Sequence, residues 1–376
     1  MKRRKAMKTI LIILCILVVL FVAGKMILFP KYEALPVSGK YDIGTLEYWV
    51  TEDIEDPYLK DGSKREVWVR VYYPRNYAEN NDNAGNIEKL PVMAVSHGSC
   101  GSIDNNESLY RECASNGYVV LALGHPGHAF DVLHSNGKKQ SVSSEYIKEV
   151  GAIKPQGNPE EAVILFKKWM DLRMADMNSV MDDFIKKYEA AEAGNTDAEG
   201  HETAGNVVNG NEASVNAALG NKEIFKSADV TRFITMGHSA GGSTALGMAR
   251  VRDDVIGVIA LESPFMYDIK GVENGEYVVD DSDLGVPVLH IYSDASWPHL
   301  REWKQYSNNV KFLDDTSGRY VNIHYAGTGH MGLCDLSLAS PVLAKVMDGM
   351  MKENDPREQL LALNRDCMGF LNTIRE

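Results

Sequence analysis

A serine between two glycines is the residue whose setting most clearly indicates chemistry in this sequence. The segment Gly237-His-Ser-Ala-Gly241 follows the apolar run Phe233 to Met236 and precedes small residues that begin at Gly242. A strand that ends in such a turn and continues as a helix is typical of a nucleophile elbow, where the turn is too tight for side chains beside the serine. The turn lifts the hydroxyl above the sheet and directs backbone N–H groups at the same point. We therefore predict that Ser239 is a nucleophile.

A serine hydroxyl at neutral pH needs a base beside it. In a sheet of this kind the base lies in the loop after the last strand, and the last apolar strand here is Tyr320 to Tyr325. His330 lies in the glycine-rich loop that follows it, so we predict that His330 is the base. His324 and His290 lie inside strands, and His238 points away from the hydroxyl by alternation. We expect these three to be structural.

Two backbone N–H groups are predicted to bind the negative oxygen that forms when a serine attacks an ester. One belongs to Ala240, the residue after the serine, and the other comes from the loop after the third strand. Here that loop reads Ser96-His-Gly-Ser99, and its glycine leaves room for the N–H groups to turn inward. We predict an oxyanion hole formed by the N–H groups of Ser99 and Ala240. The alternative interpretation is a plain turn at the end of a strand.

The carboxylate that would orient His330 has two candidates. Glu262 follows directly after the apolar strand Val255 to Leu261, where a carboxylate is shielded from water and needs a partner. Asp294 follows the next apolar strand, two residues before the usual position, which Ser296 occupies. We predict Glu262 as the acid and keep Asp294 as the alternative.

Histidines gather in a second segment, His125-Pro-Gly-His128-Ala-Phe-Asp131-Val-Leu-His134. Three imidazoles and a carboxylate could in principle hold zinc, but their spacing matches no zinc signature. We therefore predict no metal and no organic cofactor. A metal-dependent hydrolase that uses His125 and His128 stays open as one alternative function. A binding protein that keeps the scaffold without catalysis is the other.

The elements that would position these residues alternate along the chain. Residues 66–73 alternate polar and apolar side chains, and six continuous apolar runs are typical of strands buried on both faces. These runs cover residues 90–96, 118–123, 233–236, 255–261, 286–292 and 320–325. Helical patterns cover residues 105–116, 159–191, 242–251, 296–308 and 340–352. The alternation predicts an α/β fold with a mostly parallel, doubly wound sheet and helices on both faces.

In their order, these motifs resemble the α/β-hydrolase superfamily and, within it, the platelet-activating factor acetylhydrolase family together with related bacterial esterases. The resemblance spans about Val67 to Leu371. It rests on Ser96-His-Gly98, Gly117 to His125, Arg173-x-x-Asp176, the elbow, Ala260-Leu-Glu262 and Gly329-His330-x-x-x-x-Asp335.

The resemblance implies a serine-dependent carboxylic ester hydrolase, of the esterase and lipase type, that works through an acyl-enzyme without a cofactor. The family cleaves short or oxidised acyl chains from phospholipids, so a lipid ester similar to platelet-activating factor is the implied substrate class. In the family the acid follows the sixth strand, where Glu262 lies here. The family usually has aspartate at that position, and a polar segment at residues 192–220 has no counterpart in it.

The balance of charge excludes nucleic acid as a partner. The formal net charge is -13, and five of the 39 Lys and Arg residues lie among the first eight residues. The remainder of the chain therefore has 34 basic residues against 52 acidic ones. Binding to phosphates needs a basic face, which such a body does not offer.

The N-terminus predicts attachment to a membrane. Residues 1–8 form a basic cytoplasmic segment, 9–29 a transmembrane anchor, 30–45 a tether and 46–376 the catalytic domain, with a polar insertion at 192–220. As a helix the anchor is about 31 Å long, enough for a hydrocarbon core. The basic residues before it predict a single-pass protein of the cell membrane with its catalytic domain on the extracytoplasmic side. The alternative is a secreted protein whose signal peptide is cleaved.

Overall fold

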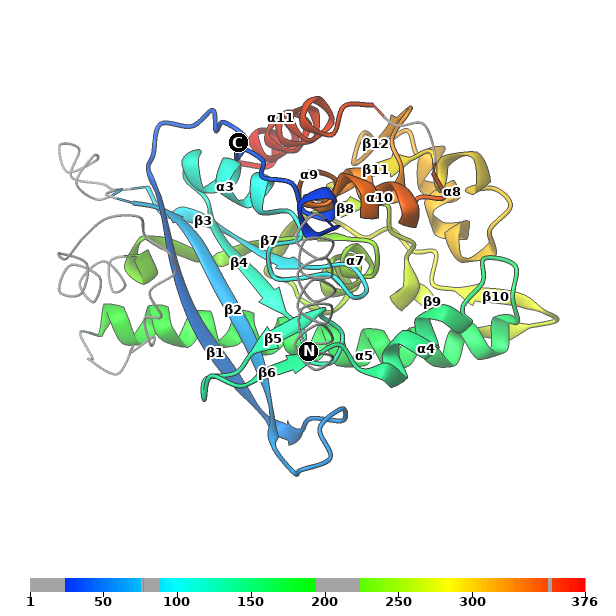
Figure 1. Ribbon diagram of the computed structural model, residues 1–376, viewed down its shortest axis with the longest axis horizontal. Coiled ribbons are helices and arrows are strands. Elements are labelled where there is room, and N and C mark those ends of the chain that lie inside the picture. Colours follow the sequence, from blue (N-terminus) through cyan, green and yellow to red (C-terminus); the bar gives the residue numbers. More distant parts are fainter. Residues whose placement is uncertain (1–23, 76, 78–87, 194–223, 351–353, 376) are drawn as a thin grey trace, which may run out of the picture.

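The computed structural model describes residues 24–75, 77, 88–193, 224–350 and 354–375, which fold around a central eight-stranded sheet (Figure 1). The strands lie in the order β1-β2-β4-β3-β7-β8-β11-β12. They are β1 (Ile43–Glu55), β2 (Lys64–Pro74), β3 (Leu90–Ser96), β4 (Val119–Gly124), β7 (Ala228–His238), β8 (Val255–Leu261), β11 (Val288–Ser293) and β12 (Tyr320–Tyr325). β2 runs antiparallel to β1 and β4, and the other neighbours are parallel. The predicted α/β-hydrolase fold with a mostly parallel sheet is confirmed.

The central strands are apolar throughout because both faces of the sheet are covered. Every residue of β4 and β11 is buried, and β3 and β8 each have a single partly exposed residue. β1 lies at an edge and alternates buried and exposed side chains over much of its length. The carboxyl ends of the parallel strands therefore meet at one edge of a rigid, dry core, and the loops that follow them lie close together.

Helices cover both faces of the sheet (Figure 1). On one face lie α5 (Pro159–Glu192) and α7 (Ala240–Val251), and on the other lie α3 (Glu107–Ser115) and α11 (Pro356–Arg375). Phe166 and Trp169 of α5 belong to the first apolar cluster, while Leu363 and Phe370 of α11 belong to the second. The sheet thus has a separate core on each side, as a doubly wound fold requires.

The long helix α5 begins where the sequence predicts it. Pro159 occupies its first turn, and the side chain of Asn158 accepts a hydrogen bond from the Glu160 N–H at 3.0 Å. Both features are typical of a helix start. Arg173 and Asp176 are three residues apart and therefore lie on the same face of α5, which is the buried one. Two charged residues are thus carried under the loops at the carboxyl ends of the strands.

The helix predicted over residues 296–308 is wrong. The chain there forms two short 3₁₀ turns, η2 (Trp297–His299) and η3 (Lys304–Tyr306), before α8 (Ser307–Leu313). Trp303 between the turns has an extended backbone, with φ −89° and ψ 109°.

Strands that sequence periodicity did not reveal form two small ribbons. They are β5 (Asp131–Leu133) with β6 (Lys139–Ser141), and β9 (Ile269–Glu273) with β10 (Glu276–Val279). Each strand is only three to five residues long. Such lengths are too short for a clear alternating pattern.

The predicted membrane anchor, residues 9–29, lies outside the described residues up to residue 23, and so does most of the predicted insertion, from residue 194 onward. Among the residues that are described, no helix has both the length and the apolar character needed to cross a bilayer. The predicted tether is packed on the domain. Leu35 and Tyr41 are buried, the Ser38 N–H donates to a Glu112 carboxylate oxygen at 2.9 Å, and β1 begins at Ile43.

Candidate active site

Ser239 lies between the end of β7 and the start of α7. Its backbone has φ 55° and ψ −125°, a conformation that residues other than glycine rarely adopt. Its N–H donates to the carbonyl oxygen of Leu261 in β8 at 2.8 Å, which ties the turn to the next strand. The side chain is partly exposed although both neighbouring residues are buried. This is the geometry of a nucleophile elbow, as the sequence predicts.

The two glycines beside the serine are needed because backbone segments approach each other closely. A Cβ atom on Gly237 would stand 2.1 Å from the backbone carbon of Gly241. A Cβ atom on Gly241 would stand 1.9 Å from the carbonyl oxygen of Ser96. The second contact shows that the end of β3 presses directly against the first turn of α7.

The loop after β3 lies against the nucleophile. A Cβ atom on Gly98 would stand 3.5 Å from the Cβ of Ser239 and 3.2 Å from Nδ1 of His238. Ser99 follows directly, and its N–H makes no hydrogen bond within the described part of the chain. Ala240 is the first residue of α7, where the N–H groups have no partner within the helix. The structure thus brings both predicted oxyanion donors to the elbow.

His330 reaches the elbow from the loop after β12. It begins the 3₁₀ turn η4 (His330–Leu333), and its ring centroid lies 4.6 Å from that of His238, the residue before Ser239. His238 Nε2 also lies 3.1 Å from the His330 carbonyl oxygen. Burial lowers the pKa of the His330 imidazole to about 4, so the ring is neutral at pH 7 and can accept a proton.

No hydrogen bond joins the Ser239 hydroxyl to the His330 ring in this structure, although both residues are among those described. Such bonds are often long in the absence of substrate and tighten when it binds. The structure places the predicted base against the residue that precedes the predicted nucleophile.

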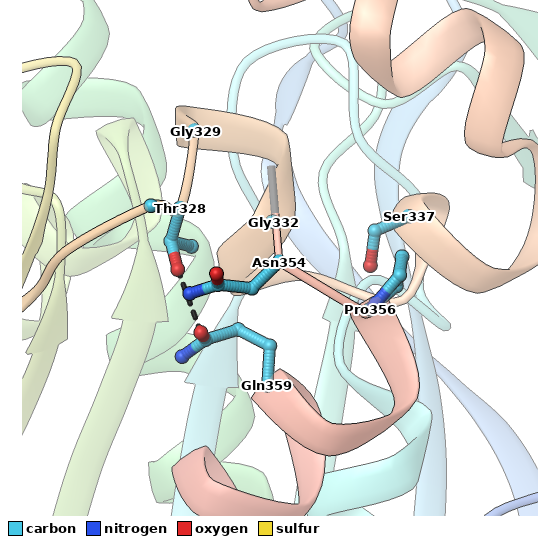
Figure 2. A pocket seen from close by; sticks show the side chains of 8 residues that line it. Thr328, Gly329, Gly332, Ser337, Asn354, Pro356 and Gln359 are labelled. Carbon is cyan, nitrogen blue, oxygen red and sulfur yellow. Dashed lines mark hydrogen bonds between the residues drawn. The ribbon is translucent and has the colours of Figure 1, made fainter. Parts of the chain in front are cut away.

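The loop that carries His330 is held from behind by the start of α11. Thr328 donates its hydroxyl to the Gln359 side-chain oxygen at 2.7 Å (Figure 2), and the Asn354 side chain donates to the Ala326 carbonyl oxygen at 2.8 Å. These side chains line a small cavity with Gly329, Gly332, Ser337 and Pro356, among others. Neither Ser239 nor His330 lines it. The cavity therefore lies beside the loop and not at the nucleophile.

Glu262 is buried at the end of β8, with only 2% of its surface exposed. Its backbone has φ 53°, and one carboxylate oxygen accepts a hydrogen bond from the Ser293 N–H. The other oxygen, Oε1, is buried and has no hydrogen-bond partner among the described residues. Burial raises the pKa of the carboxyl to about 7, and contacts with Ser296 and Ser293 oppose that shift. Glu262 Oε1 thus makes no well-formed hydrogen bond, although Ser296 lies close enough to the carboxyl to affect its pKa, and Glu262 makes no hydrogen bond with His330 in this structure.

Both carboxylate oxygens of Asp294 have hydrogen-bond partners. Its Oδ1 lies 2.7 Å from Nε2 of His324, and its Oδ2 accepts from the Gly327 N–H at 2.7 Å. The carboxylate is about one-quarter exposed, and both of its oxygens serve the strand end and the loop beside it. Of the two acids that the sequence suggests, Glu262 is the one with a carboxylate oxygen that has no hydrogen-bond partner among the described residues.

Residues with a strained backbone follow the strands at this same edge of the sheet. Among the described residues, five that are not glycine have a positive φ, and three of them follow the neighbouring strands β3, β7 and β8. These three are Cys100 at 56°, Ser239 at 55° and Glu262 at 53°. Strain of this kind persists only where surrounding contacts enforce it, and it concentrates at functional sites.

The histidine-rich segment is engaged in the protein's own hydrogen bonds. His125 Nδ1 lies 2.7 Å from an Asp176 carboxylate oxygen, and its Nε2 lies 2.8 Å from the Ser96 hydroxyl. His128 Nε2 lies 2.7 Å from the Tyr58 hydroxyl. His125 therefore has no nitrogen left for a metal ion, and the described residues contain no cluster of ligands that could hold one. These contacts disfavour the metal alternative.

Some neighbours of the site could not be recognised from the sequence. Tyr146 of α4 (Ser144–Ala152) reaches the Ser99 hydroxyl at 2.8 Å, and Arg173 of α5 reaches the His97 carbonyl oxygen. The one available signal in the sequence was the pair Arg173 and Asp176, two charged residues three positions apart on a helix with a buried face. Their partners are 51 to 111 residues away in the chain, where local patterns carry no information.

Comparisons with known proteins agree with this fold. Residues 78–376 match the model of the family described as platelet-activating factor acetylhydrolase, isoform II. A ferulic acid esterase from Streptomyces cinnamoneus has a similar structure, with a TM-score of 0.57 over 90% of this chain and 91% of its own. The two sequences are 17% identical, so this likeness concerns the fold. No curated protein shows significant similarity to this chain.

Proposed function

This chain belongs to the platelet-activating factor acetylhydrolase, isoform II family, and on that premise we propose that it is a serine-dependent carboxylic ester hydrolase that works through an acyl-enzyme. The family and the esterase of similar structure support a hydrolase that acts on esters. The proposal adds the residues that carry out the reaction.

In the first step, the Ser239 oxygen attacks the ester carbonyl carbon while His330 takes the hydroxyl proton. The carbonyl oxygen becomes negative, and the N–H groups of Ser99 and Ala240 donate hydrogen bonds to it. Glu262 accepts a hydrogen bond from the other nitrogen of His330 and stabilises the imidazolium. The proton then passes to the departing alcohol as the carbon–oxygen bond to that alcohol breaks.

The second step repeats the first with water as the attacking group. His330 takes a proton from the water, which attacks the acyl carbon, and the Ser239 oxygen leaves with the proton that His330 returns. The products are a carboxylic acid and the regenerated enzyme. The residues named above complete the cycle without a cofactor.

The strongest support for this function is the geometry of Ser239. The strained backbone of Ser239 holds a partly exposed hydroxyl at the elbow, with the Gly98 loop against its Cβ and the His330 ring against the preceding residue. A merely structural turn has no need for a strained serine at this point.

The Ser239→Ala variant tests the proposal directly. It should lose hydrolysis of a short-chain p-nitrophenyl ester, down to the level of buffer, while its circular dichroism spectrum and Tm stay near those of the parent protein. Ser243→Ala is the matched control, because Ser243 lies in α7, which begins directly after Ser239, and donates its hydroxyl to the Pro264 carbonyl oxygen. Turnover that survives in Ser239→Ala would refute the proposal.

For the substrate we propose a lipid ester with a short acyl chain, similar to platelet-activating factor, since the family is described by that activity. A series of p-nitrophenyl esters with acyl chains of increasing length, set beside phospholipids with the same chains, measures both preferences. The proposal expects kcat/KM to fall as the acyl chain lengthens. It also expects higher kcat/KM for the phospholipid than for the simple ester of equal chain length.

We further propose that residues 9–29 anchor the protein in the cell membrane with its catalytic domain on the extracytoplasmic side. The support is the sequence of that segment, basic before it and apolar within it. Protease added to intact cells should digest the catalytic domain and leave a short protected fragment. Release of the whole domain into the medium would instead indicate a cleaved signal peptide.

A further inference from the structure

Arg173 carries a positive charge into the interior without a carboxylate of its own. Its side chain is fully buried, and no carboxylate oxygen lies within ion-pair distance of it among the described residues. Arg65, which is equally buried, shows the usual arrangement, because it binds both Asp56 and Asp176. Burial lowers the pKa of Arg173, and the charge of Asp176 opposes that shift without a direct contact. A buried cation that no carboxylate contacts is costly, so its retention calls for a reason.

The guanidinium of Arg173 donates hydrogen bonds to one backbone carbonyl and two side-chain hydroxyls behind the elbow. Nη2 donates to the His97 carbonyl oxygen and, at 3.1 Å, to the Ser96 hydroxyl, while Nε donates to the Thr244 hydroxyl at 3.3 Å. Nη1 is buried and has no hydrogen-bond partner within the described part of the chain. These bonds hold the end of β3 and the first turn of α7 together. The two predicted oxyanion donors belong to these two segments.

The orientation of the Ser99 N–H is fixed by the hydrogen bonds of the preceding peptide carbonyl. A peptide unit is planar, so fixing its carbonyl group also fixes the N–H on its other side. The Gly98 carbonyl oxygen accepts from Nδ1 of His97 at 2.6 Å and from the Gly101 N–H at 3.0 Å. The N–H across that peptide is the one of Ser99. His97 Nε2 accepts from the His125 N–H at 3.2 Å, which places the ring proton on Nδ1.

The Ser99 side chain is held as well. Its hydroxyl lies 2.8 Å from the Tyr146 hydroxyl. The Tyr146 ring is buried and stacks on His128, with ring centroids 3.7 Å apart and an interplanar angle of 12°. Burial raises the pKa of Tyr146, while the charge of Arg173 lowers it, so the phenol lies within the field of the guanidinium. Ser99 is thus fixed through both its backbone and its side chain.

A second chain of hydrogen bonds orients the Ser96 hydroxyl toward Arg173. Asp176 accepts from Nδ1 of His125 at 2.7 Å, and Nε2 of His125 accepts from Ser96 at 2.8 Å. Burial lowers the pKa of His125 to about 4, so its ring is neutral and only this direction of donation is consistent. The Ser96 oxygen then has lone pairs free for Arg173. Serine, histidine and aspartate here repeat the order of a catalytic triad, but all three are fully buried and cannot meet a substrate.

From these contacts we propose that Arg173 is a positioning residue of the oxyanion hole. It fixes the segment Ser96 to Ser99, and its positive charge, which no carboxylate among the described residues contacts, stabilises the negative charge that forms on the ester oxygen in the transition state. A cation beside the hole favours the charged transition state over the neutral ester. The inference rests on the proposed function, since it needs a reaction in which an oxyanion forms.

The test compares Arg173→Met, which removes the charge, with Arg173→Lys, which keeps the charge but loses the forked geometry. Arg173→Met should lower kcat about 10²-fold with KM changed less than threefold, the size expected for one lost element of an oxyanion hole. Arg173→Lys should lie between it and the parent enzyme. Arg250→Met is the matched control, because Arg250 pairs with Asp268 at the far end of α7 and should keep kcat within twofold.

A second readout separates positioning from general damage. A trifluoromethyl ketone forms a negatively charged hemiketal on a serine nucleophile, so its Ki should rise by the same factor as kcat falls in each Arg173 variant. Should Arg173→Met fail to fold, Tyr146→Phe provides the same comparison, since it removes only the hydroxyl that holds Ser99. A folded variant with unchanged kcat and unchanged Ki would overturn the inference. If Ser239→Ala stays active, the proposed function itself has failed.

Discussion

The rings of His238 and His330 lie 4.6 Å apart, centroid to centroid, although 92 residues separate them in the chain. The first ring belongs to the residue before Ser239 and the second to the loop after the last strand of the sheet. The fold thereby brings a neutral imidazole against the residue that precedes a strained serine, at the edge where the strands β3, β7 and β8 end.

The choice of acid can be decided by two variants of equal size. Glu262→Gln should lower kcat about 10³- to 10⁴-fold, because an amide cannot stabilise the imidazolium or hold the correct tautomer. Asp294→Asn should cost less than tenfold, because that carboxylate serves His324 and Gly327. Steady-state hydrolysis of a p-nitrophenyl ester measures both. The reverse ranking would make Asp294 the acid.

The pH dependence of kcat/KM should follow the ionisation of the Glu262 carboxyl. Activity needs Glu262 ionised and His330 neutral, so both requirements fail on the acid side. Burial raises the pKa of Glu262 to about 7 and lowers that of His330 to about 4. In the parent enzyme kcat/KM should therefore fall as pH drops below about 7. The residual rate of Glu262→Gln should stay flat to about pH 4, because glutamine has no proton to gain. Equal midpoints for the two proteins would contradict the assignment.

The tight elbow should make one glycine irreplaceable. Gly241→Ala would place a Cβ atom 1.9 Å from the Ser96 carbonyl oxygen, so the elbow must open and the protein should lose several degrees of Tm together with its activity. Gly369→Ala is the opposite control, because nothing lies within 4 Å of the added atom and the site is in α11. That variant should gain about 0.5–1 kcal/mol of unfolding free energy. Equal behaviour of the two variants in thermal unfolding would show that close backbone approach does not govern this turn.

Removal of metal ions should leave the enzyme unaffected. Both nitrogens of His125 are occupied by Asp176 and Ser96, so a chelator has no ion to take from that histidine. Prolonged treatment with EDTA should change kcat by less than the experimental error, whereas a fluorophosphonate should abolish activity. Loss of activity to EDTA that zinc restores would favour the metal alternative.

The sequence was sufficient to predict the frame of this molecule. Continuous apolar runs revealed the buried strands because both faces of the sheet are covered, and the glycines around Ser239 revealed the elbow because only they fit there. The loop position of His330 followed from the order of the strands. The break in residues 296–308 was not predicted, since the conformation of Trp303 depends on tertiary contacts and not on local periodicity.

The buried hydrogen bonds that hold the loops of the site could not have been predicted in the same way. Arg173 contacts His97 across 76 residues, and His125 contacts Asp176 across 51. No local pattern links such pairs, because they meet only after the helix has packed on the sheet. The sequence also left the acid open, and the difference between an occupied Asp294 and a vacant oxygen on Glu262 became visible only with the hydrogen bonds in view.

The most direct test of the account is to locate the residue that a fluorophosphonate modifies. The protein is treated with the reagent, digested and analysed by tandem mass spectrometry. We predict one adduct per chain, on Ser239, and no adduct after denaturation in acid or urea, since the elbow and its base are then lost. An intact, folded protein that gains no adduct, or that is modified on a serine other than Ser239, would contradict the account.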